Sequence, residues 1–205
     1  MKARVVIPIV LAILLTAGVG VVGLILLNQE SQEFRGQVMT TLRYAPDFTL
    51  TDQNGNPYGF RARDSEATVL FFGYTYCPDV CPATMVTWRE AMAGLRRYRD
   101  RVRFVYVSVD PERDTPERLK EYLALYDPGI IGLTGTPEEV AAVADAYRIY
   151  VEKTPMPDGE EGYLIGHTAT SYLIDSEGFI RVKFPTGTDP SVVANDVRVL
   201  LQQSR

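Results

Sequence analysis

The sequence has little positive charge and no concentrated basic stretch. Its 21 lysines and arginines are outnumbered by 26 aspartates and glutamates, which leaves a net charge of −5 at pH 7. Because binding to nucleic acid requires lysine and arginine gathered on one surface, this balance argues against it. Arginines do occur close together between 96 and 103, but Asp100 lies among them, and we interpret them as a solvated helix end. The chain also lacks an internal repeat, which favours one globular domain.

Cysteine and histidine are scarce as well, with 2 cysteines and 1 histidine in 205 residues. A zinc site built from these side chains lacks the fourth ligand that zinc normally takes. A peroxidase with a distant resolving cysteine is not matched either, because both cysteines lie in one short motif. Any thiol or metal chemistry therefore depends on Cys77, Cys81 and His167.

One segment is strongly apolar. Residues 5–27 form an uncharged run of 23 residues, and about 20 are needed to cross a hydrocarbon core of roughly 30 Å. The run is longer than the apolar region of a cleaved signal, it has no small-residue cleavage site, and no cysteine follows it to carry a lipid. Lys2 and Arg4 precede it, and no basic residue follows until Arg35. We therefore expect an uncleaved single-pass anchor in the cell membrane, with the rest of the chain extracytoplasmic.

Downstream of this run, apolar segments alternate with amphipathic ones. Buried strands are predicted at 69–74 and 102–109, with a helix over 82–98 between them, which makes a βαβ unit. Threonine caps followed by proline predict two further helices, after Thr115 and Thr136. The other predicted elements are an N-terminal hairpin over 48–58, a hairpin with strands 170–174 and 179–184, and a last helix from Asp189.

This order predicts an α/β fold, namely a thioredoxin-like domain with an N-terminal hairpin and an inserted helix and loop, preceded by one transmembrane helix. Prolines and glycines in the stretch 153–166 predict a long exposed loop. The expected organisation is a cytoplasmic N-terminus over 1–4, the anchor over 5–27, a linker over 28–43 and the thioredoxin-like domain over 44–205.

Cys77 and Cys81 lie where the first buried strand gives way to the first long helix. The positive potential and free N–H groups of a helix start stabilise a thiolate, which both disulfide exchange and metal binding require. Four-residue spacing in a helical turn places the Cα atoms about 6 Å apart, within the range of a disulfide. A redox-active pair and a purely stapling disulfide are both open, although so small a loop adds little stability.

His167 precedes the strand predicted at 170–174. A lone histidine is more often structural than a ligand, but in a thioredoxin-like sheet the loop before this strand passes beside the cysteine-bearing helix start. Two sulfurs and one nitrogen form a soft set that suits Cu(I) best, so copper is the expected metal. Met85 and Met156 are weaker candidate ligands, and Met85 fits core packing better. Tyr74 and Tyr76 are expected to pack beside the site.

Three features together resemble the SCO/SenC family. They are the sequence GYTYCPDVCP over 73–82, the sequence VDPERDT over 109–115, and His167. The resemblance covers nearly the whole chain and implies a thioredoxin-like copper protein that helps to assemble the binuclear copper (CuA) centre of cytochrome c oxidase. It also implies that Cys77, Cys81 and His167 are the ligands of Cu(I) and Cu(II). In that family an acidic residue usually precedes this histidine, whereas Gly166 stands here.

The segment after the second buried strand has two interpretations. Asp110 begins the family signature there, and it is either an oxygen ligand or neighbour of the metal or part of a loop that caps the next helix. We expect Asp110 to lie outside the core.

Three functions remain open at this point. The first is a copper chaperone without catalytic turnover, whose partner is the copper subunit of the oxidase. The second is a thiol-disulfide oxidoreductase that keeps the cysteines of that subunit reduced. The third, a peroxidase, is suggested by the sequence of residues 45–52, although the distant resolving cysteine of such enzymes is absent. Three residues rather than two separate Cys77 from Cys81, which favours copper, and a thioredoxin-like reductant must then reduce the pair before it binds metal.

Overall fold

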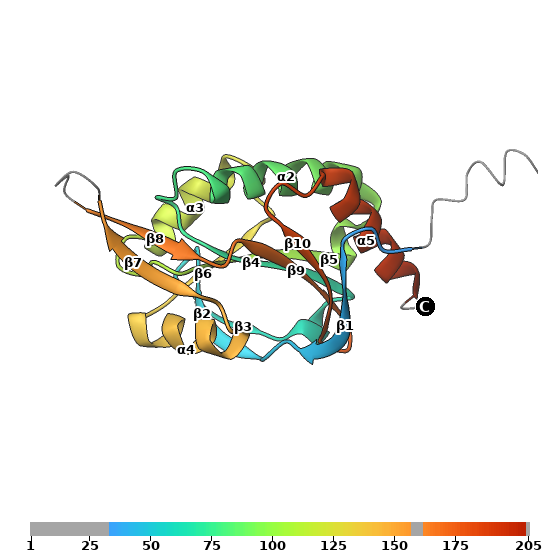
Figure 1. The fold of residues 1–205 in the computed structure, drawn as a ribbon, viewed down its shortest axis with the longest axis horizontal. Helices are drawn as coiled ribbons and strands as arrows, with labels where there is room; N and C mark the ends of the chain where they lie inside the picture. Colours follow the sequence, from blue (N-terminus) through green and yellow to red (C-terminus); the bar gives the residue numbers. More distant parts are fainter. Residues whose placement is uncertain (1–32, 157–161, 204–205) are drawn as a thin grey trace, which may run out of the picture. The chain divides into compact units, whose positions relative to one another are not determined.

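A mixed sheet of 8 strands forms the centre of the domain (Figure 1). The computed structural model describes residues 33–156 and 162–203. The strands are β1 (Gln37–Tyr44), β2 (Phe48–Asp52), β3 (Pro57–Phe60), β4 (Ala67–Gly73), β5 (Val102–Ser108), β6 (Ile131–Thr134), β9 (Thr170–Asp175) and β10 (Phe179–Pro185). Their order is β1-β10-β9-β4-β5-β6-β2-β3. β4, β5 and β6 are parallel, and all other neighbours are antiparallel.

Helices cover both faces of this sheet (Figure 1). They are α2 (Val80–Gly94), α3 (Pro116–Ala124), α4 (Pro137–Tyr147) and α5 (Pro190–Gln203). Adjacent residues of a strand point to opposite faces. On β4, Phe71 packs against Trp88 of α2, whereas Phe72 packs against Tyr147 of α4. The α/β prediction is therefore confirmed, with α2 and α4 on opposite sides.

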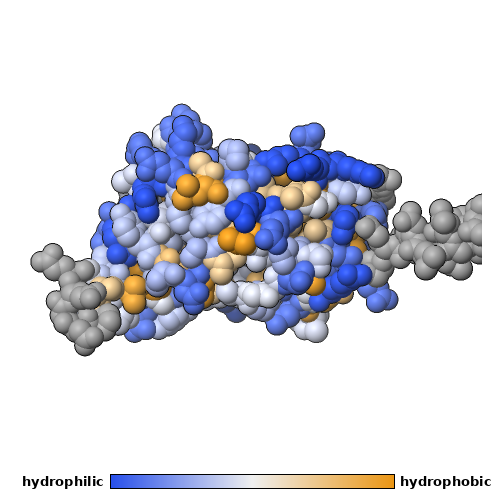
Figure 2. Space-filling view, turned by 90° about the horizontal axis from the view of Figure 1, so that it is seen from above, coloured by the Kyte–Doolittle hydropathy of each residue, from blue (hydrophilic) through white to orange (hydrophobic). Residues whose placement is uncertain are grey.

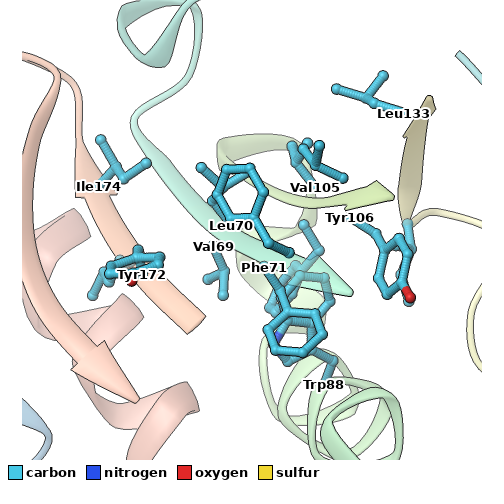
Figure 3. Close-up of a cluster of buried hydrophobic side chains, with 14 of the residues drawn as sticks. Val69, Leu70, Phe71, Trp88, Val105, Tyr106, Leu133, Tyr172 and Ile174 are labelled. Carbon is cyan, nitrogen blue, oxygen red and sulfur yellow. The ribbon is translucent and has the colours of Figure 1, made fainter. Parts of the chain in front are cut away.

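The core lies around β4, which is buried at every position. Its run of apolar residues has no polar alternation because both faces of this central strand are covered. Figure 3 shows Phe71 and Trp88 beside Tyr106 on one side of the sheet, which is the side covered by α2. The Trp88 indole N–H donates to Ser171 Oγ at 3.2 Å, so the polar atom of this core side chain is satisfied.

Most predicted elements are confirmed. Thr115 caps α3, and Thr136 with Glu139 forms a complete capping box on α4. The hairpins β2–β3 and β9–β10 and the helix from Pro190 are present. The helix predicted over 82–98 ends instead at Gly94, where a 3-10 turn over Arg96–Arg101 follows.

The prediction of a linker over 28–43 is wrong for its last part. Residues Gln37–Tyr44 form the edge strand β1, paired with β10, and the compact unit begins at Phe34 rather than at 44. The N–H groups of Arg35 and Gly36 both donate to the Asp196 carboxylate at 2.8 Å. β1 is largely exposed, so its hydrogen bonds hold it without the apolar pattern by which a buried strand is recognised.

The stretch 153–166 is not simply a loop. β7 (Val151–Pro155) and β8 (Tyr163–His167) form an antiparallel hairpin, seen at the left of Figure 1, and its strands pair Val151 with His167. β7 is exposed at every position, so no burial pattern marks it in the sequence. The strand β6 was not predicted either.

The predicted anchor over 5–27 lies outside the described residues. Within the described part of the chain, no helix combines the length and apolarity needed to cross a membrane. The face in Figure 2, which α2 and α3 cover, shows small separate apolar areas among hydrophilic residues. On this face, the described surface offers no broad hydrophobic patch.

Candidate metal centre

Both cysteines lie at the junction of β4 and α2. Cys81 is the second residue of α2, and its backbone N–H donates to Cys77 Sγ at 3.4 Å. The helix N-cap residue, Asp79, makes no side-chain capping bond. Since the first N–H groups of a helix have no partner within it, the Cys77 sulfur takes the place of a capping oxygen. The helix start therefore holds this sulfur and stabilises its negative charge.

Gly73 makes room for the second sulfur. A Cβ on this glycine would lie 2.9 Å from Cys81 Sγ, 2.8 Å from the Tyr106 hydroxyl and 2.6 Å from Phe71. All three contacts are closer than a carbon atom tolerates. The chain thus needs a glycine at the end of β4 so that the buried thiol can pack against the sheet.

His167 approaches from the other side, at the end of β8. Its ring makes edge contacts with Phe71 and Tyr74, with centroids 5.9 and 5.8 Å away. Its Nδ1 lies 3.3 Å from the carbonyl oxygen of Thr168. Because a carbonyl only accepts hydrogen bonds, this contact places the proton on Nδ1 and leaves the Nε2 lone pair free. Nε2 lies 3.3 Å from Cys81 Sγ.

The three predicted ligand residues are brought together. The two sulfurs and the imidazole nitrogen all lie within 4.8 Å of one another, from segments 86 residues apart in sequence. Within the described ranges, this is the one group of three or more such side chains with that spacing. Both cysteines are free thiols.

The two thiols have opposite electrostatic surroundings. The pKa of Cys77 is lowered to about 4, first because the Cys81 side chain donates a hydrogen bond to it, and further by the backbone N–H groups of the helix start. Burial raises the pKa of Cys81 well above its usual range. Cys77 is half-buried and Cys81 is fully buried. Cys77 is therefore the reactive thiolate and Cys81 the enclosed partner.

A buried carboxylate fixes the loop that leads to Cys77. Asp114 accepts from the Thr75 N–H at 3.0 Å, from the Thr75 hydroxyl at 2.7 Å and from the Ser108 hydroxyl at 2.6 Å. Thr75 thereby connects the cysteine loop to the end of β5 and to the turn before α3. The part of the SCO/SenC-like signature around Asp114 is thus a structural support for the loop.

Asp110 does not belong to the ligand cluster. The prediction that it lies outside the core is wrong, because it is 1% exposed. Its carboxylate accepts from Arg113 Nε at 2.5 Å and from the Tyr163 hydroxyl at 2.7 Å. Asp110 therefore joins the end of β5 to the base of β8, the strand that carries His167.

The other candidate residues, two methionines and two tyrosines, lie in different surroundings. Met85 is fully buried core, as expected, whereas Met156 directly follows β7, and its N–H donates to the Gly162 carbonyl at 3.2 Å. Tyr74 is buried beside the His167 ring, and its hydroxyl accepts from the Ile165 N–H at 3.2 Å. Tyr76 is instead 50% exposed, under the guanidinium groups of Arg113 and Arg118.

Two residues of the site were missed from sequence, Gly73 and Tyr106. A glycine that ends a fully apolar strand directly before the cysteine motif is a signal that was available for the first. Tyr106 looks like any other core residue of β5, so only the structure shows that its hydroxyl faces the site.

Comparison with known proteins agrees with this geometry. An SCO2-like protein of Rickettsia felis is 32% identical over 192 residues, which are 92% of this chain and 94% of that relative. The solved structure of Bradyrhizobium japonicum ScoI with copper bound is 39% identical with a TM-score of 0.69, covering 80% of this chain and 100% of that one. Copper-bound Arabidopsis thaliana ScoI is 32% identical with a TM-score of 0.70, covering 78% and 99%.

These structures also confirm the thioredoxin-like fold. The family model described as SCO1/SenC matches residues 37–202, from the first strand of the sheet to the last helix. With both cysteines and the histidine inside that range, this chain belongs to the SCO1/SenC family.

Proposed function

We propose that the chain binds copper through Cys77, Cys81 and His167 and carries it as cargo. The observation that carries the proposal is the convergence of two sulfurs and one imidazole nitrogen within 4.8 Å. Two soft thiolates and one nitrogen suit Cu(I), and copper-binding relatives of the same fold support the choice of metal. The chemistry that copper supplies is one-electron exchange between Cu(I) and Cu(II).

Each ligand residue has a distinct role in this proposal. The Cys77 thiolate is held by the helix start and is half-buried, so it is the sulfur through which copper enters and leaves. Cys81 anchors the ion from the buried side. His167 presents Nε2, because Nδ1 is engaged with Thr168. A half-exposed ligand beside a buried one is suited to transfer between proteins.

The acceptor in this proposal is the copper subunit of cytochrome c oxidase, where the chain assists assembly of the CuA centre. A thioredoxin-like reductant keeps Cys77 and Cys81 from forming a disulfide, since only the reduced pair binds metal. The apolar run over 5–27 anchors the chain in the cell membrane, with residues 1–4 cytoplasmic and the domain extracytoplasmic. The proposed organisation has a shorter tether than the linker predicted over 28–43, because β1 begins at Gln37.

The test is a titration of the His167→Ala variant against a copper chelator, with Cu(I) and Cu(II) measured separately. We expect both affinities to fall, Cu(II) most, because two thiolates still hold Cu(I) in a linear geometry. Met156→Ala is the matched control, since it removes a soft donor from the same hairpin and should change neither affinity. Unchanged binding in His167→Ala would reject the three-ligand site.

The chain has a single histidine, which gives a second and independent readout. Its ring nitrogens produce one unambiguous pair of NMR signals. Addition of Cu(I) should shift the Nε2 signal strongly and the Nδ1 signal weakly. A stronger shift of the Nδ1 signal would show that copper binds Nδ1, which contradicts the proposed ligand atom.

A second function is supported by the unequal burial of the thiols. Cys77 is half-buried with a lowered pKa, and Cys81 lies next to it, as an attacking and a resolving thiol do. As an oxidoreductase, the Cys77 thiolate attacks a partner disulfide, and Cys81 then displaces the partner as a dithiol, leaving a Cys77–Cys81 disulfide. This exchange needs no imidazole, so His167→Ala would keep disulfide reduction while losing copper.

A further inference from the structure

The Tyr106 hydroxyl is a buried polar group beside the site, without a hydrogen-bond partner in the described part of the chain. Tyr106 lies on β5 and is 0% exposed. Among the described residues, its oxygen has no hydrogen-bond partner. A buried hydroxyl without a partner costs folding free energy, so its presence in the core asks for an explanation.

This hydroxyl faces Cys81 across the space above Gly73. One point, the position of a Cβ on Gly73, is 2.8 Å from the Tyr106 oxygen and 2.9 Å from Cys81 Sγ. Figure 3 shows the Tyr106 ring on the same side of the sheet as Phe71, whose ring centroid is 5.9 Å away. The hydroxyl and the sulfur therefore border the same small space beside Gly73.

Cys81 needs a donor when it becomes a metal ligand. Its sulfur is fully buried and now lies against His167 Nε2 at 3.3 Å. When Nε2 gives its lone pair to a metal, the contact between Nε2 and the Cys81 thiol is lost. The sulfur is then a thiolate cut off from water. Cys77 receives the N–H of Cys81 at the helix start, whereas beside Cys81 lies the Tyr106 hydroxyl, which has no partner among the described residues. A buried thiolate without such donors is unfavourable.

We propose that Tyr106 donates an O–H···S hydrogen bond to the Cys81 thiolate when this sulfur holds copper, and thereby favours Cu(I) over Cu(II). This inference rests on the proposed copper site. A hydrogen bond to a ligating sulfur withdraws electron density from it and weakens its donation to Cu(II), which raises the reduction potential of the bound metal. Tyr106 is a positioning residue, because it acts on copper through Cys81.

The experiment compares Tyr106→Phe with Tyr122→Phe. Tyr122 on α3 is 7% exposed, its hydroxyl also lacks a partner among the described residues, and its ring centroid lies 6.1 Å from that of Tyr106. Each variant removes one buried hydroxyl and keeps the ring, so both should fold at least as stably as the wild type. They differ in whether the lost hydroxyl faces a sulfur.

The readouts are the Cu(I) affinity by chelator competition and the sulfur-to-Cu(II) charge-transfer band. In Tyr106→Phe we expect Cu(I) affinity to fall about tenfold, the lower end for loss of a hydrogen bond to a metal ligand, and the band to move to longer wavelength. Tyr122→Phe should match the wild type in both. Equal behaviour of the two variants, with copper bound normally by the wild type, would overturn the inference.

Failure of the copper site itself gives a different result, because the wild type would then bind no copper at all. In that event the inference is rejected together with the copper site, because no metal-bound sulfur is left for Tyr106 to act on.

Discussion

The two parts of the molecule that meet at the site differ in how they are held. The β4–α2 junction, which carries both thiols, grows out of a strand buried at every residue. The β7–β8 hairpin, which carries the imidazole, has one strand exposed at every residue. Polar contacts fix it to the domain, among them the Ile165 N–H to the Tyr74 hydroxyl and the Tyr163 hydroxyl to Asp110. A metal ion bound here would tie a peripheral element to a rigid core.

This difference indicates which part of the site opens first. Regions with few buried apolar contacts open locally at lower free energy than core strands do. In the absence of metal, His167 should therefore leave and rejoin the two sulfurs more readily than the sulfurs separate from each other. Such an arrangement suits binding and release of cargo.

The largest effect is expected from Gly73→Ala, which disturbs packing at the β4–α2 junction. The new methyl group would lie within 2.6 to 2.9 Å of Phe71, Tyr106 and Cys81. Overpacking of this kind typically costs about 1–3 kcal/mol, and here it also displaces the buried sulfur. Chemical unfolding and copper titration measure the two consequences.

Gly94→Ala is the matched control for that variant. A Cβ at this position in α2 meets only an ordinary contact at 3.5 Å, so stability should be unchanged or rise by up to about 1 kcal/mol. If Gly73→Ala behaved like Gly94→Ala, the close packing of Cys81 against β4 would be contradicted.

The next effect concerns pH and separates the two thiols. The pKa of Cys77 is lowered to about 4 in the folded protein, against 9.0 for a free thiol. Between these values the unfolded chain keeps a proton that the folded chain has released, so the stability contributed by Cys77 is present above pH 9 and is lost as pH falls toward 4. Unfolding of the reduced, metal-free protein should show this contribution in the wild type and not in Cys77→Ser.

The comparison is made as the difference between these two proteins at several pH values, because groups away from the site titrate equally in both. A difference that grows from acid to neutral pH is the expected result. A constant difference would mean that the helix start does not stabilise the Cys77 thiolate.

A smaller effect is expected on the hairpin side. Tyr163→Phe removes the hydroxyl that donates to Asp110 at 2.7 Å and leaves the buried carboxylate with one donor fewer. The cost should be about 1 kcal/mol, felt mainly by β7 and β8. Hydrogen exchange should become faster in the hairpin and stay unchanged in β4.

Tyr150→Phe is the control here, because Tyr150 is 58% exposed and its hydroxyl bonds Glu152 of β7. It should leave exchange in both regions unaltered. Faster exchange in β4 after Tyr163→Phe would show that hairpin and core open together, which removes the proposed difference between them.

The smallest effect is expected from Gly166→Glu, which introduces the acidic residue that SCO/SenC proteins usually have before this histidine. A Cβ there lies 3.7 Å from Tyr150 and 3.9 Å from the Glu152 carbonyl, so a side chain fits. The free energy of unfolding should change by no more than about 0.5 kcal/mol. A large loss of stability would show that the strand needs glycine at this position.

Much of the fold could be predicted because it depends on burial or on local capping. The unbroken apolar run of β4 and the Thr-Pro helix starts at Thr115 and Thr136 leave strong patterns in the sequence. β1 and β7 leave none, since an edge strand and an exposed hairpin are held by backbone pairing that any sequence can make. For this reason the predicted linker over 28–43 is too long, and the stretch 153–166 reads as a loop in the sequence.

The sequence by itself determined which atoms are available for chemistry, namely two sulfurs and one imidazole, and it placed the sulfurs at a helix start. Only the tertiary structure decided that His167 meets them, that Asp110 is buried in a link to β8, and that the Tyr106 hydroxyl faces Cys81. The physical reason is the separation in sequence of the residues that make each contact. A helix start is set by residues a few positions apart, whereas the approach of His167 to Cys81 joins positions 86 residues apart, which only packing of the sheet and hairpin brings together.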